Sequence, residues 1–383
     1  MREKGKCVMI VGLGDLGGWV LELLARSQGV SKIIAVDVRE EYGLRKTRCA
    51  AAGASMQGYF KNIEFHKMDV NNIDETAELL GNIQPDVIYS AVTLQSWWVR
   101  ELLPKDIVRK VTSVGGGPLI PLQILLIYKL MQAVKQSGIT THVLNNSGPD
   151  YTNPVLWRNG LGPTLGAGNL QFLVEKIRHR ISKLENVPVR DVTVLGVGIH
   201  AVVMQDPRKV HVPYFMKCMV RDEDITNKYN LDSLITEEIL AWPPPAQMSW
   251  LLHPLVAASA VQNILGIIND TNELSHAPGP NGLIGCYPVR LNASGVEVIL
   301  PEGLTLEEAI KINTDGLKWD GYQEIKDDGT MIFTREACEV YQELLEIDID
   351  RQFRLEDAEE RAKELLSAYK SLTEKYKTPT YLY

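Results

Sequence analysis

The chain has 383 residues, of which 45% are hydrophobic and 23% are charged, and its formal net charge is -8. This length favours two domains or one domain with a large addition, and the composition is typical of a folded globular protein. The sequence has a negative net charge and no Lys/Arg cluster interleaved with aromatic residues, so it does not predict a nucleic-acid-binding surface.

The sequence also predicts a cytoplasmic protein without a membrane anchor. The opening residues, MREKGKCVMIVG, contain no apolar run long enough for a signal peptide. The most apolar long segment, residues 251–268, carries His253, Pro254 and two amide side chains, which favours a buried helix over a membrane span. The five cysteines are scattered and never form a CxxC pair, and the histidines fit no ligand spacing, so neither a disulfide framework nor a metal site is expected.

From residue 6 to about residue 146, short β-rich runs alternate with longer helical segments. The runs are CVMIVG, KIIAVDV, IEFHKMDV, DVIYSAV and THVLNN. Such alternation is typical of parallel βαβ units. The sequence therefore predicts a doubly wound parallel sheet in a first domain, residues 1–146.

A glycine pattern, Gly12-Leu13-Gly14-Asp15-Leu16-Gly17, stands between the first run and the first helical segment. The first glycine of such a pattern permits a tight turn, the second lets the backbone approach a pyrophosphate, and the third permits close packing of helix on strand. The second run ends in Asp37, 20 residues after Gly17, where an acid binds the ribose hydroxyls of NAD. We therefore predict a Rossmann domain that binds NAD; Arg39 leaves NADP partly open as an alternative.

Further residues at the ends of the predicted strands are assigned to the same nucleotide site. Asp69 ends the third run, and for it a loop or helix-capping role is an equally good interpretation. The predicted cofactor residues are Gly12, Gly14, Asp15, Leu16, Gly17, Asp37, Val38, Asp69, Ala91 and Thr93.

After residue 146 the pattern changes to a mixture of helices and strands. A turn is predicted at SGPDYTNP, residues 147–154. A helix is predicted over residues 169–184, followed by the strands DVTVLGVGIHAVV and HVPYFMKCMV. The last residues are rich in Glu, Lys, Leu and Ala at helical spacing, which predicts one or two amphipathic helices on the outside of the protein. We expect an α+β substrate domain over residues 147–315 and a helical extension over residues 316–383.

The order of the segments HVLNNSGPDYTNPVL, LGAGNLQFLVEKIRHRI and VTVLGVGIHAVV, followed by a long helix, a hairpin and a final helix, resembles the lactate and malate dehydrogenase superfamily over about residues 6 to 310. The resemblance implies a C-terminal domain like that of these dehydrogenases, assembly as a homodimer or homotetramer, and a small-molecule substrate. It also implies that His200 is the catalytic acid/base and that Asn146 lies near the nicotinamide ribose and the reacting carbonyl. The alternative for His200 is a core histidine, and His253 is a rival catalyst.

Two positions depart from this superfamily. Gln171 stands where the family has the aspartate that orients the histidine, and Val174 stands where it has the arginine that grips the substrate carboxylate. An uncharged Gln171 beside His200 predicts a lowered proton affinity of the histidine. The loss of the arginine predicts that the substrate is not a simple 2-hydroxy acid in the usual pose.

The predicted substrate residues surround this region. In the loop LQSWWVRELLPKDIVRKVTSVGGGPLIP, a tryptophan could cover the substrate, an arginine could replace the missing cation, and residues 115–117 could act as a hinge. The alternative for the tryptophans is packing against a neighbouring domain or subunit. The predicted substrate residues are Trp97, Arg100, Asn169, Gln171 and Ser249, with Arg109 as an alternative cation.

The sequence therefore predicts an NAD-dependent oxidoreductase acting on a hydroxyl, carbonyl or amino-acid-derived small molecule. One alternative is a lyase or epimerase that uses tightly bound NAD transiently. Family 4 glycosidases share the architecture and use NAD in this way, but their metal-binding cysteine corresponds to Gly168 here. The other alternative is a non-catalytic NAD-binding protein.

Overall fold

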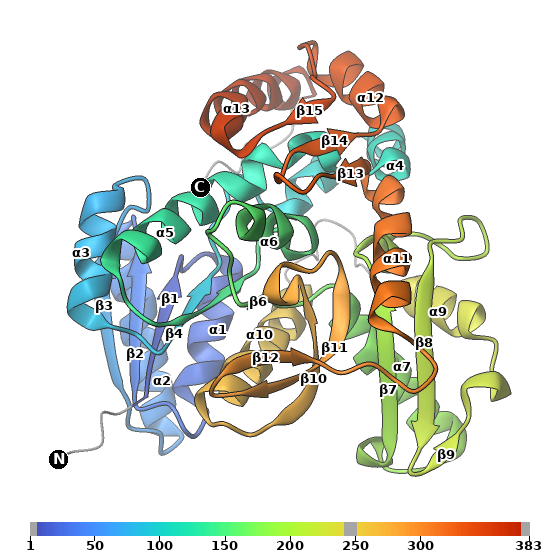
Figure 1. Cartoon of the computed structure of the whole chain (residues 1–383). Helices are drawn as coiled ribbons and strands as arrows, with labels where there is room; N and C mark the ends of the chain where they lie inside the picture. The colour runs from blue at the N-terminus through green and yellow to red at the C-terminus, as the bar shows by residue number, and fades with distance from the viewer. Residues whose placement is uncertain (1–5, 241–250, 377–383) are drawn as a thin grey trace.

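The computed structural model describes residues 6–240 and 251–376. Its first part is a six-stranded parallel sheet in the order β3-β2-β1-β4-β5-β6 (Figure 1). The strands are β1 (Cys7–Val11), β2 (Lys32–Asp37), β3 (Asn62–Lys67), β4 (Val87–Ser90), β5 (His142–Asn145) and β6 (Leu165–Gly166). The doubly wound sheet is confirmed with all five expected strands. The sixth strand is additional, and it follows residue 146, so the sheet continues past the expected end of the first domain.

Helices cover both faces of this sheet. They are α1 (Asp15–Ala25), α2 (Glu40–Met56), α3 (Ile73–Ile83) and α5 (Pro121–Ser137). Helix α4 (Lys105–Val114) lies instead against the C-terminal part of the chain. Side chains of β1 alternate between two apolar cores, since Met9 and Val11 enter the core shared with α5 while Val8 and Ile10 enter the core shared with α1. A central strand buried on both faces is what the uninterrupted run CVMIV predicts.

The second part is an antiparallel sheet in the order β10-β11-β7-β8-β9, with β12 paired to β11. Its strands are β7 (Val192–Gly198), β8 (Tyr214–Val220), β9 (Glu223–Asp224), β10 (Glu273–Pro278), β11 (Cys286–Asn292) and β12 (Gly295–Val298). The accompanying helices are α6 (Pro149–Arg158), α7 (Leu170–Glu185), α8 (Ala201–Met204), α9 (Leu231–Leu240), α10 (His253–Ile268) and α11 (Leu306–Gly316). The buried helix expected at residues 251–268 is confirmed as α10. Strand β7 is shorter than expected, because the chain turns into α8 at His200.

The C-terminal part holds the two amphipathic helices that the sequence predicts, α12 (Arg335–Leu345) and α13 (Ala358–Lys375). It also contains a small sheet of β13 (Tyr322–Ile325), β14 (Met331–Phe333) and β15 (Gln352–Phe353), preceded by the 3-10 turn η7 (Leu317–Asp320). The sequence pattern does not predict these strands, which are only two to four residues long. Figure 1 shows this part lying over α4 and α5, and contacts join α12 to α4 and α13 to α5.

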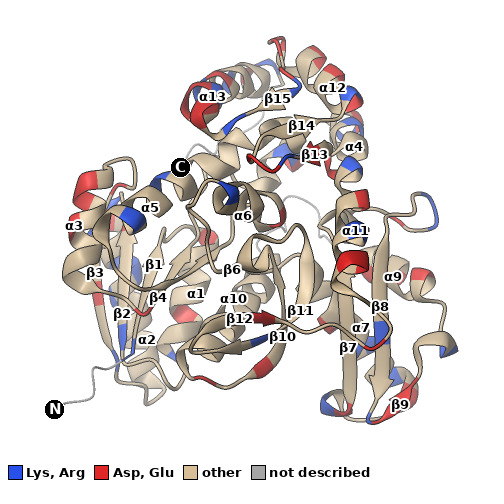
Figure 2. Ribbon diagram, in the orientation of Figure 1, with Lys and Arg blue, Asp and Glu red and all other residues tan. Residues whose placement is uncertain are grey.

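Charged side chains lie mainly on the outer elements. Both signs occur along α12 and α13 in Figure 2, as expected for solvated helix faces. Within residues 6–240 and 251–376, no helix is long and apolar enough to cross a membrane. All five cysteines are free, and only Cys49 is exposed.

Candidate functional site

The glycine loop lies where β1 ends and α1 begins. The backbone N–H of Gly12 donates to the carbonyl of Val36 over 2.9 Å, and its φ of +88° favours glycine. A Cβ on Gly17 would lie 1.8 Å from the carbonyl oxygen of Gly12, so no larger residue fits there. These two glycines are therefore required by the turn and by the contact between helix and loop.

Gly14 differs from the other two glycines, because a Cβ built on it would meet no atom within 4 Å. Its φ of -57° lies outside the left-handed range, so neither a left-handed backbone nor a close contact of a Cβ accounts for a glycine here. No side chain caps the first turn of α1, which contains Asp15 and Leu16. Open space in front of uncapped helix N–H groups suits a pyrophosphate, and the loop therefore fits a dinucleotide.

Asp37 ends β2 and is only 6% exposed. Its Oδ2 accepts from the backbone N–H of Leu13 over 2.8 Å, and its Oδ1 accepts from the backbone N–H and Nε of Arg39 over 2.9 and 3.1 Å. Burial opposes ionisation, but the hydrogen bonds from Arg39 and Leu13 hold the pKa of Asp37 below its ordinary value. The acid thus joins the glycine loop as expected, while Arg39 neutralises part of its charge.

This ion pair leads to a prediction on cofactor choice. We expect NADH to bind more tightly than NADPH, and Arg39→Ala to widen the difference, because the freed carboxylate would repel a 2′-phosphate more strongly. Asp37→Ala should narrow the difference and also cost about 1–3 kcal/mol of stability, because it removes the acceptor of Leu13 N–H. Fluorescence titration and thermal unfolding measure the two effects. Equal affinities of the unaltered protein for both nucleotides would contradict the prediction.

Of the other expected cofactor residues, some line the glycine loop and others have structural contacts. Ala91 follows β4, and its Cβ lies 3.3 Å from the position of a Cβ on Gly17, so it lines the loop. The hydroxyl of Thr93 lies within hydrogen-bond distance of the carbonyls of Gln95 and Leu122, at 3.1 and 3.0 Å. Thr93 therefore has a structural role in this structure.

Asp69, Val38 and Asn146 lie at the same end of the sheet. Asp69 is exposed, and its Oδ1 accepts from the backbone N–H and side-chain amide of Asn71, both over 2.9 Å, which is the loop role weighed as its alternative. Val38 is 53% exposed. The Oδ1 atom of Asn146 is buried and has no hydrogen-bond partner among the described residues. An unpaired buried amide oxygen of this kind is compatible with a ligand contact.

His200 stands between β7 and α8. Its Nδ1 lies 2.9 Å from Oδ1 of Asp320, whose Oδ2 accepts from the backbone N–H of Ala201 over 2.7 Å and from the hydroxyl of Tyr151. The side chain of Asp320 is 8% exposed and that of His200 is 31% exposed. Within the described part of the chain, Nε2 of His200 makes no hydrogen bond. A carboxylate-oriented imidazole with one open nitrogen is suited to proton transfer.

The expected contact between Gln171 and His200 is wrong. The amide of Gln171 donates to Gln262 and Ser275, each over 3.1 Å, and its oxygen accepts from Ser259. Gln171 thus belongs to a buried polar network between α7, α10 and β10. The partner of His200 comes instead from η7, 120 residues later in the chain.

Asp320 gives no recognisable signal in the sequence, where it precedes a glycine and would be interpreted as a turn residue. Of the three glycines at residues 115–117, expected as a hinge, Gly115 and Gly117 pack against this segment. A Cβ on Gly115 would lie 2.1 Å from the backbone carbon of Asp320, and one on Gly117 would lie 2.5 Å from the carbonyl oxygen of Gly321. These glycines allow the close backbone approach that brings Asp320 to His200.

Asp150 is a second acid in this region, and its segment, which the sequence predicts as a turn, forms the start of helix α6 instead. It lies in the first turn of α6 and is fully buried. Its Oδ2 accepts from the side-chain amide of Asn169, while its Oδ1 has no partner among the described residues. Burial raises the pKa of Asp150 to about 6.

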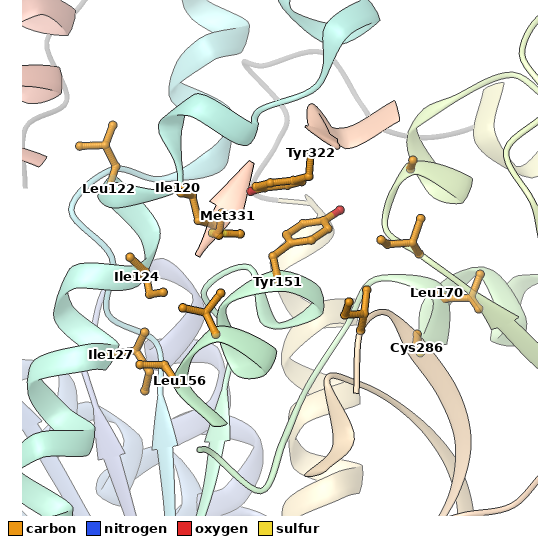
Figure 3. Close-up of a cluster of buried hydrophobic side chains, with 14 of the residues drawn as sticks. Ile120, Leu122, Ile124, Ile127, Tyr151, Leu156, Leu170, Cys286, Tyr322 and Met331 are labelled. Atoms are coloured by element: carbon orange, nitrogen blue, oxygen red, sulfur yellow. The ribbon is translucent and has the colours of Figure 1, made fainter. Parts of the chain in front are cut away.

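Two buried tyrosines, Tyr151 and Tyr322, lie beside these acids. Tyr151 extends from α6 towards Tyr322 of β13, with ring centroids 4.5 Å apart (Figure 3). Burial raises the pKa of both tyrosines well above the ordinary value, so both remain neutral. We name Asp150, Tyr151, His200 and Asp320 the polar cluster.

The structure reverses the expectation of a weakly basic His200. Burial lowers the pKa of His200, but the carboxylates of Asp320 and Asp150 outweigh burial and raise the pKa above its ordinary value of 6.5. The positive charge of Arg100 opposes them weakly.

If neutral His200 accepts the proton in an oxidation, the rate should rise as pH rises through this increased pKa. We expect the midpoint of the acidic limb above pH 6.5, and Asp320→Asn should move it down by about one pH unit or more, because an opposing charge is lost. Profiles of kcat/KM against pH measure the shift. A midpoint below 6.5 in the unaltered protein would show that Asp320 does not stabilise the protonated ring.

The other expected substrate residues differ in burial and in ion pairing. Trp98 is buried in an apolar core, whereas Trp97 is 41% exposed. The Nε of Arg100 lies 3.1 Å from Oε1 of Glu101, so its charge is already paired. Arg109 is exposed on α4.

Three further positions complete the expected set. Asn169 lies at the start of α7, and its side-chain amide donates to Asp150. The backbone φ of Asn169 is +57°. Val174, which stands in the place of the family's arginine, is buried against Gly196. Ser249 lies outside the described residues. The rival histidine, His253, is buried at the start of α10 within range of the charges of Asp15 and Lys46, and burial lowers its pKa.

The polar cluster is joined to the carboxyl edge of the parallel sheet by the chain itself. In a doubly wound sheet, ligands bind at this edge, where the glycine loop follows β1. Strand β5 ends at Asn145, and helix α6 with Asp150 and Tyr151 begins four residues later. Among the described residues, no group of three or more His, Cys, Asp or Glu side chains could hold a metal ion.

Comparison with known proteins agrees with this architecture. No protein-family model matches the sequence, and no curated protein matches it. Among solved structures, it is similar to a lactate dehydrogenase from a deep-sea metagenome of the Medee basin, at a TM-score of 0.58 and 15% identity, covering 82% of this chain and 96% of that one. It is also similar to a lactate dehydrogenase of Eimeria maxima, solved with NADH and oxamate. The TM-score is 0.56 and the identity 16%, over 83% of this chain and 92% of that one. Malate dehydrogenase of Plasmodium falciparum is similar at a TM-score of 0.57 and 14% identity, over 88% of this chain and 99% of that one. The chain has the fold of the lactate and malate dehydrogenases.

Proposed function

We propose that this protein is an NAD-dependent oxidoreductase acting on a hydroxyl or carbonyl group of a small molecule. The observation that carries the proposal is the His200–Asp320 pair, which leaves Nε2 of His200 open and is joined through Tyr151 to the carboxyl edge of the sheet. Support for the cofactor comes from the open space at Gly14 and from the acid at the end of β2. A similar dehydrogenase has been solved with NADH. Bound NAD supplies the hydride acceptor or donor.

The protein residues supply proton transfer and orientation. In an oxidation, Nε2 of His200 takes the hydroxyl proton, and in a reduction it returns a proton to the carbonyl oxygen. Asp320 fixes the ring through Nδ1 and stabilises the protonated form. Its second oxygen is held by Ala201 and Tyr151, so the carboxylate cannot rotate without losing two hydrogen bonds.

The charges near His200 favour a neutral or cationic substrate. Val174 provides no cation, and Arg100 is paired with Glu101. The carboxyl groups of Asp150 and Asp320 add negative charge instead. A substrate carboxylate would be repelled here, whereas an amino alcohol, an amino-acid-derived amine or a neutral hydroxy compound would not. The proposal therefore excludes simple 2-hydroxy acids as the preferred substrates.

Reduction of NAD⁺ with a panel of compounds tests the proposal. The panel contains neutral polyols, amino alcohols, lactate and malate, and the absorbance of NADH is followed. We expect turnover with a neutral or amino-bearing alcohol and little with lactate or malate. Fastest turnover with lactate or malate would contradict the charge argument. Tightly retained NAD without net reduction would favour the lyase or epimerase alternative, and failure to bind NAD would overturn the proposal. The cytoplasmic location and the dimeric or tetrameric assembly remain predictions.

A further inference from the structure

Lys46 reaches the glycine loop from the neighbouring helix α2, and the glycine pattern gives it no role. Its Nζ atom lies 3.3 Å from the carbonyl oxygen of Gly14. The same oxygen accepts from the backbone N–H of Gly18 over 2.9 Å, so the ammonium group of Lys46 lies beside the first turn of α1. The open space in front of Gly14, which suits a pyrophosphate, begins at this turn.

A fourth glycine, Gly18, provides the space for the end of this side chain. It lies inside α1, where glycine weakens a helix relative to alanine. The dinucleotide pattern does not account for it, because that pattern ends at Gly17. A Cβ built on Gly18 would lie 2.4 Å from Nζ of Lys46 and 3.3 and 3.4 Å from its Cδ and Cε atoms. The missing side chain of Gly18 therefore allows Lys46 to lie against the start of α1.

The protein itself compensates the charge of Lys46 only in part. The residue is half-buried, and its ammonium group has three N–H donors. Within residues 6–240 and 251–376, Nζ of Lys46 contacts the carbonyl of Gly14 and the ring of Tyr42, whose centroid lies 5.2 Å away, and it forms no ion pair. A cation beside the N-terminus of a helix is unfavourable, because that end of the helix is already positive. An anion bound at this turn would reverse the sign of the interaction.

Asp15 makes a cation necessary at this turn if an anion is to bind there. It lies in the first turn of α1, and both Asp15 and Lys46 act electrostatically on His253 at the start of α10. Burial lowers the pKa of His253, so this histidine is mostly neutral at pH 7. Arg39 is paired with Asp37 over 3.1 Å. Of these groups, Lys46 is the cation that can balance Asp15.

We propose that Lys46 is a binding residue for the diphosphate of the dinucleotide, because its charge offsets Asp15 and makes the space in front of Gly14 attractive to an anion. The positive end of a helix is equivalent to roughly half an elementary charge. The carboxylate of Asp15 outweighs this charge, so the helix end with Asp15 alone would repel a diphosphate, whereas Lys46 restores a positive potential. The inference rests on the proposed function, since the diphosphate belongs to NAD.

Two substitutions of Lys46 separate its charge from its hydrogen bond. Lys46→Gln removes the charge and keeps a donor for the carbonyl of Gly14, whereas Lys46→Arg keeps the charge. We expect Lys46→Gln to weaken NADH binding by about tenfold or more, the scale of one charge interaction near a protein surface. Lys46→Arg should stay within about threefold of the unaltered protein, because the charge is kept. Calorimetric titration of the full-length protein with NADH measures both effects, and thermal unfolding shows that each variant is folded.

Salt and a second substitution test the balance of charges directly. Added NaCl should weaken NADH binding more steeply in the unaltered protein than in Lys46→Gln, because salt screens the interaction that the variant lacks. Asp15→Asn introduced into Lys46→Gln should recover part of the lost affinity. The matched control is Lys61→Gln: Nζ of Lys61 donates to the backbone carbonyl of Val30 over 2.7 Å, at the start of the strands and away from the glycine loop, so NADH affinity should not change.

The outcomes separate this inference from the proposed function. If the unaltered protein does not bind NADH, the proposed function fails. If it does, the inference is overturned by unchanged affinity in Lys46→Gln, by equal losses in Lys46→Gln and Lys46→Arg, or by no recovery with Asp15→Asn. An equal loss in Lys61→Gln would also overturn it, since the effect would then belong to the net charge of the protein. If Lys46→Gln does not fold, Lys46→Met replaces it, because its unbranched side chain keeps the packing against Gly18.

Discussion

His200→Asn is expected to lower turnover by about two to four orders of magnitude while NAD affinity stays within a factor of two or so, because asparagine cannot carry a proton between substrate and solvent. Its amide can still donate to Asp320, so the expected loss of stability is about 1 kcal/mol. Turnover with the best compound of the panel, NADH titration and thermal unfolding measure the three quantities.

His276→Asn is the matched control, because His276 is a buried histidine with a structural role. Its Nε2 accepts from the backbone N–H of Gly196 over 3.0 Å, and burial lowers its pKa to about 3. The control should lose about 1–3 kcal/mol of stability, since a buried backbone donor loses its partner, yet keep its turnover per folded molecule. If His200→Asn behaves like this control, His200 is a core histidine and the enzymatic proposal fails.

Gly14→Val is expected to reduce NAD binding by at least about a hundredfold while the protein keeps its fold. The added side chain would enter the space in front of the first turn of α1, which the structure leaves open and which a pyrophosphate would occupy. The φ of Gly14 is -57°, so valine would not have to adopt a left-handed backbone. Calorimetric titration with NADH measures the loss.

Two other glycines provide controls for this change. Gly81, in α3, also has nothing within 4 Å of a built Cβ, so Gly81→Val should leave both folding and NAD binding unchanged. Gly17→Val should instead destabilise the loop, because its Cβ would lie 1.8 Å from the carbonyl oxygen of Gly12. Normal NAD binding by a folded Gly14→Val protein would show that the loop is only a structural turn.

The cofactor half of the site could be predicted because its signals are local. Gly12, Gly14 and Gly17 lie within six residues, and Asp37 follows at the end of the next strand. The βαβ unit alone determines how these residues meet, and the alternation of short apolar runs with helical segments predicts that unit. The sequence did not reveal the hydrogen bonds of Asp37. An aspartate and an arginine two residues apart, Asp37 and Arg39, are compatible with an ion pair or with a free carboxylate.

The catalytic half depended on contacts between distant segments. The sequence alone determined that a histidine follows β7 and that the usual aspartate and arginine are replaced by Gln171 and Val174. It could not show that Asp320 replaces the aspartate, because that contact spans 120 residues and depends on the backbone of residues 320–321 packing against Gly115 and Gly117. Only tertiary packing decides such a contact, and it reverses the expected basicity of His200. The same reason explains why the sequence predicts a turn at Asp150. Its burial and its unpaired oxygen result from the packing of distant helices and strands on α6, which no local sequence pattern predicts.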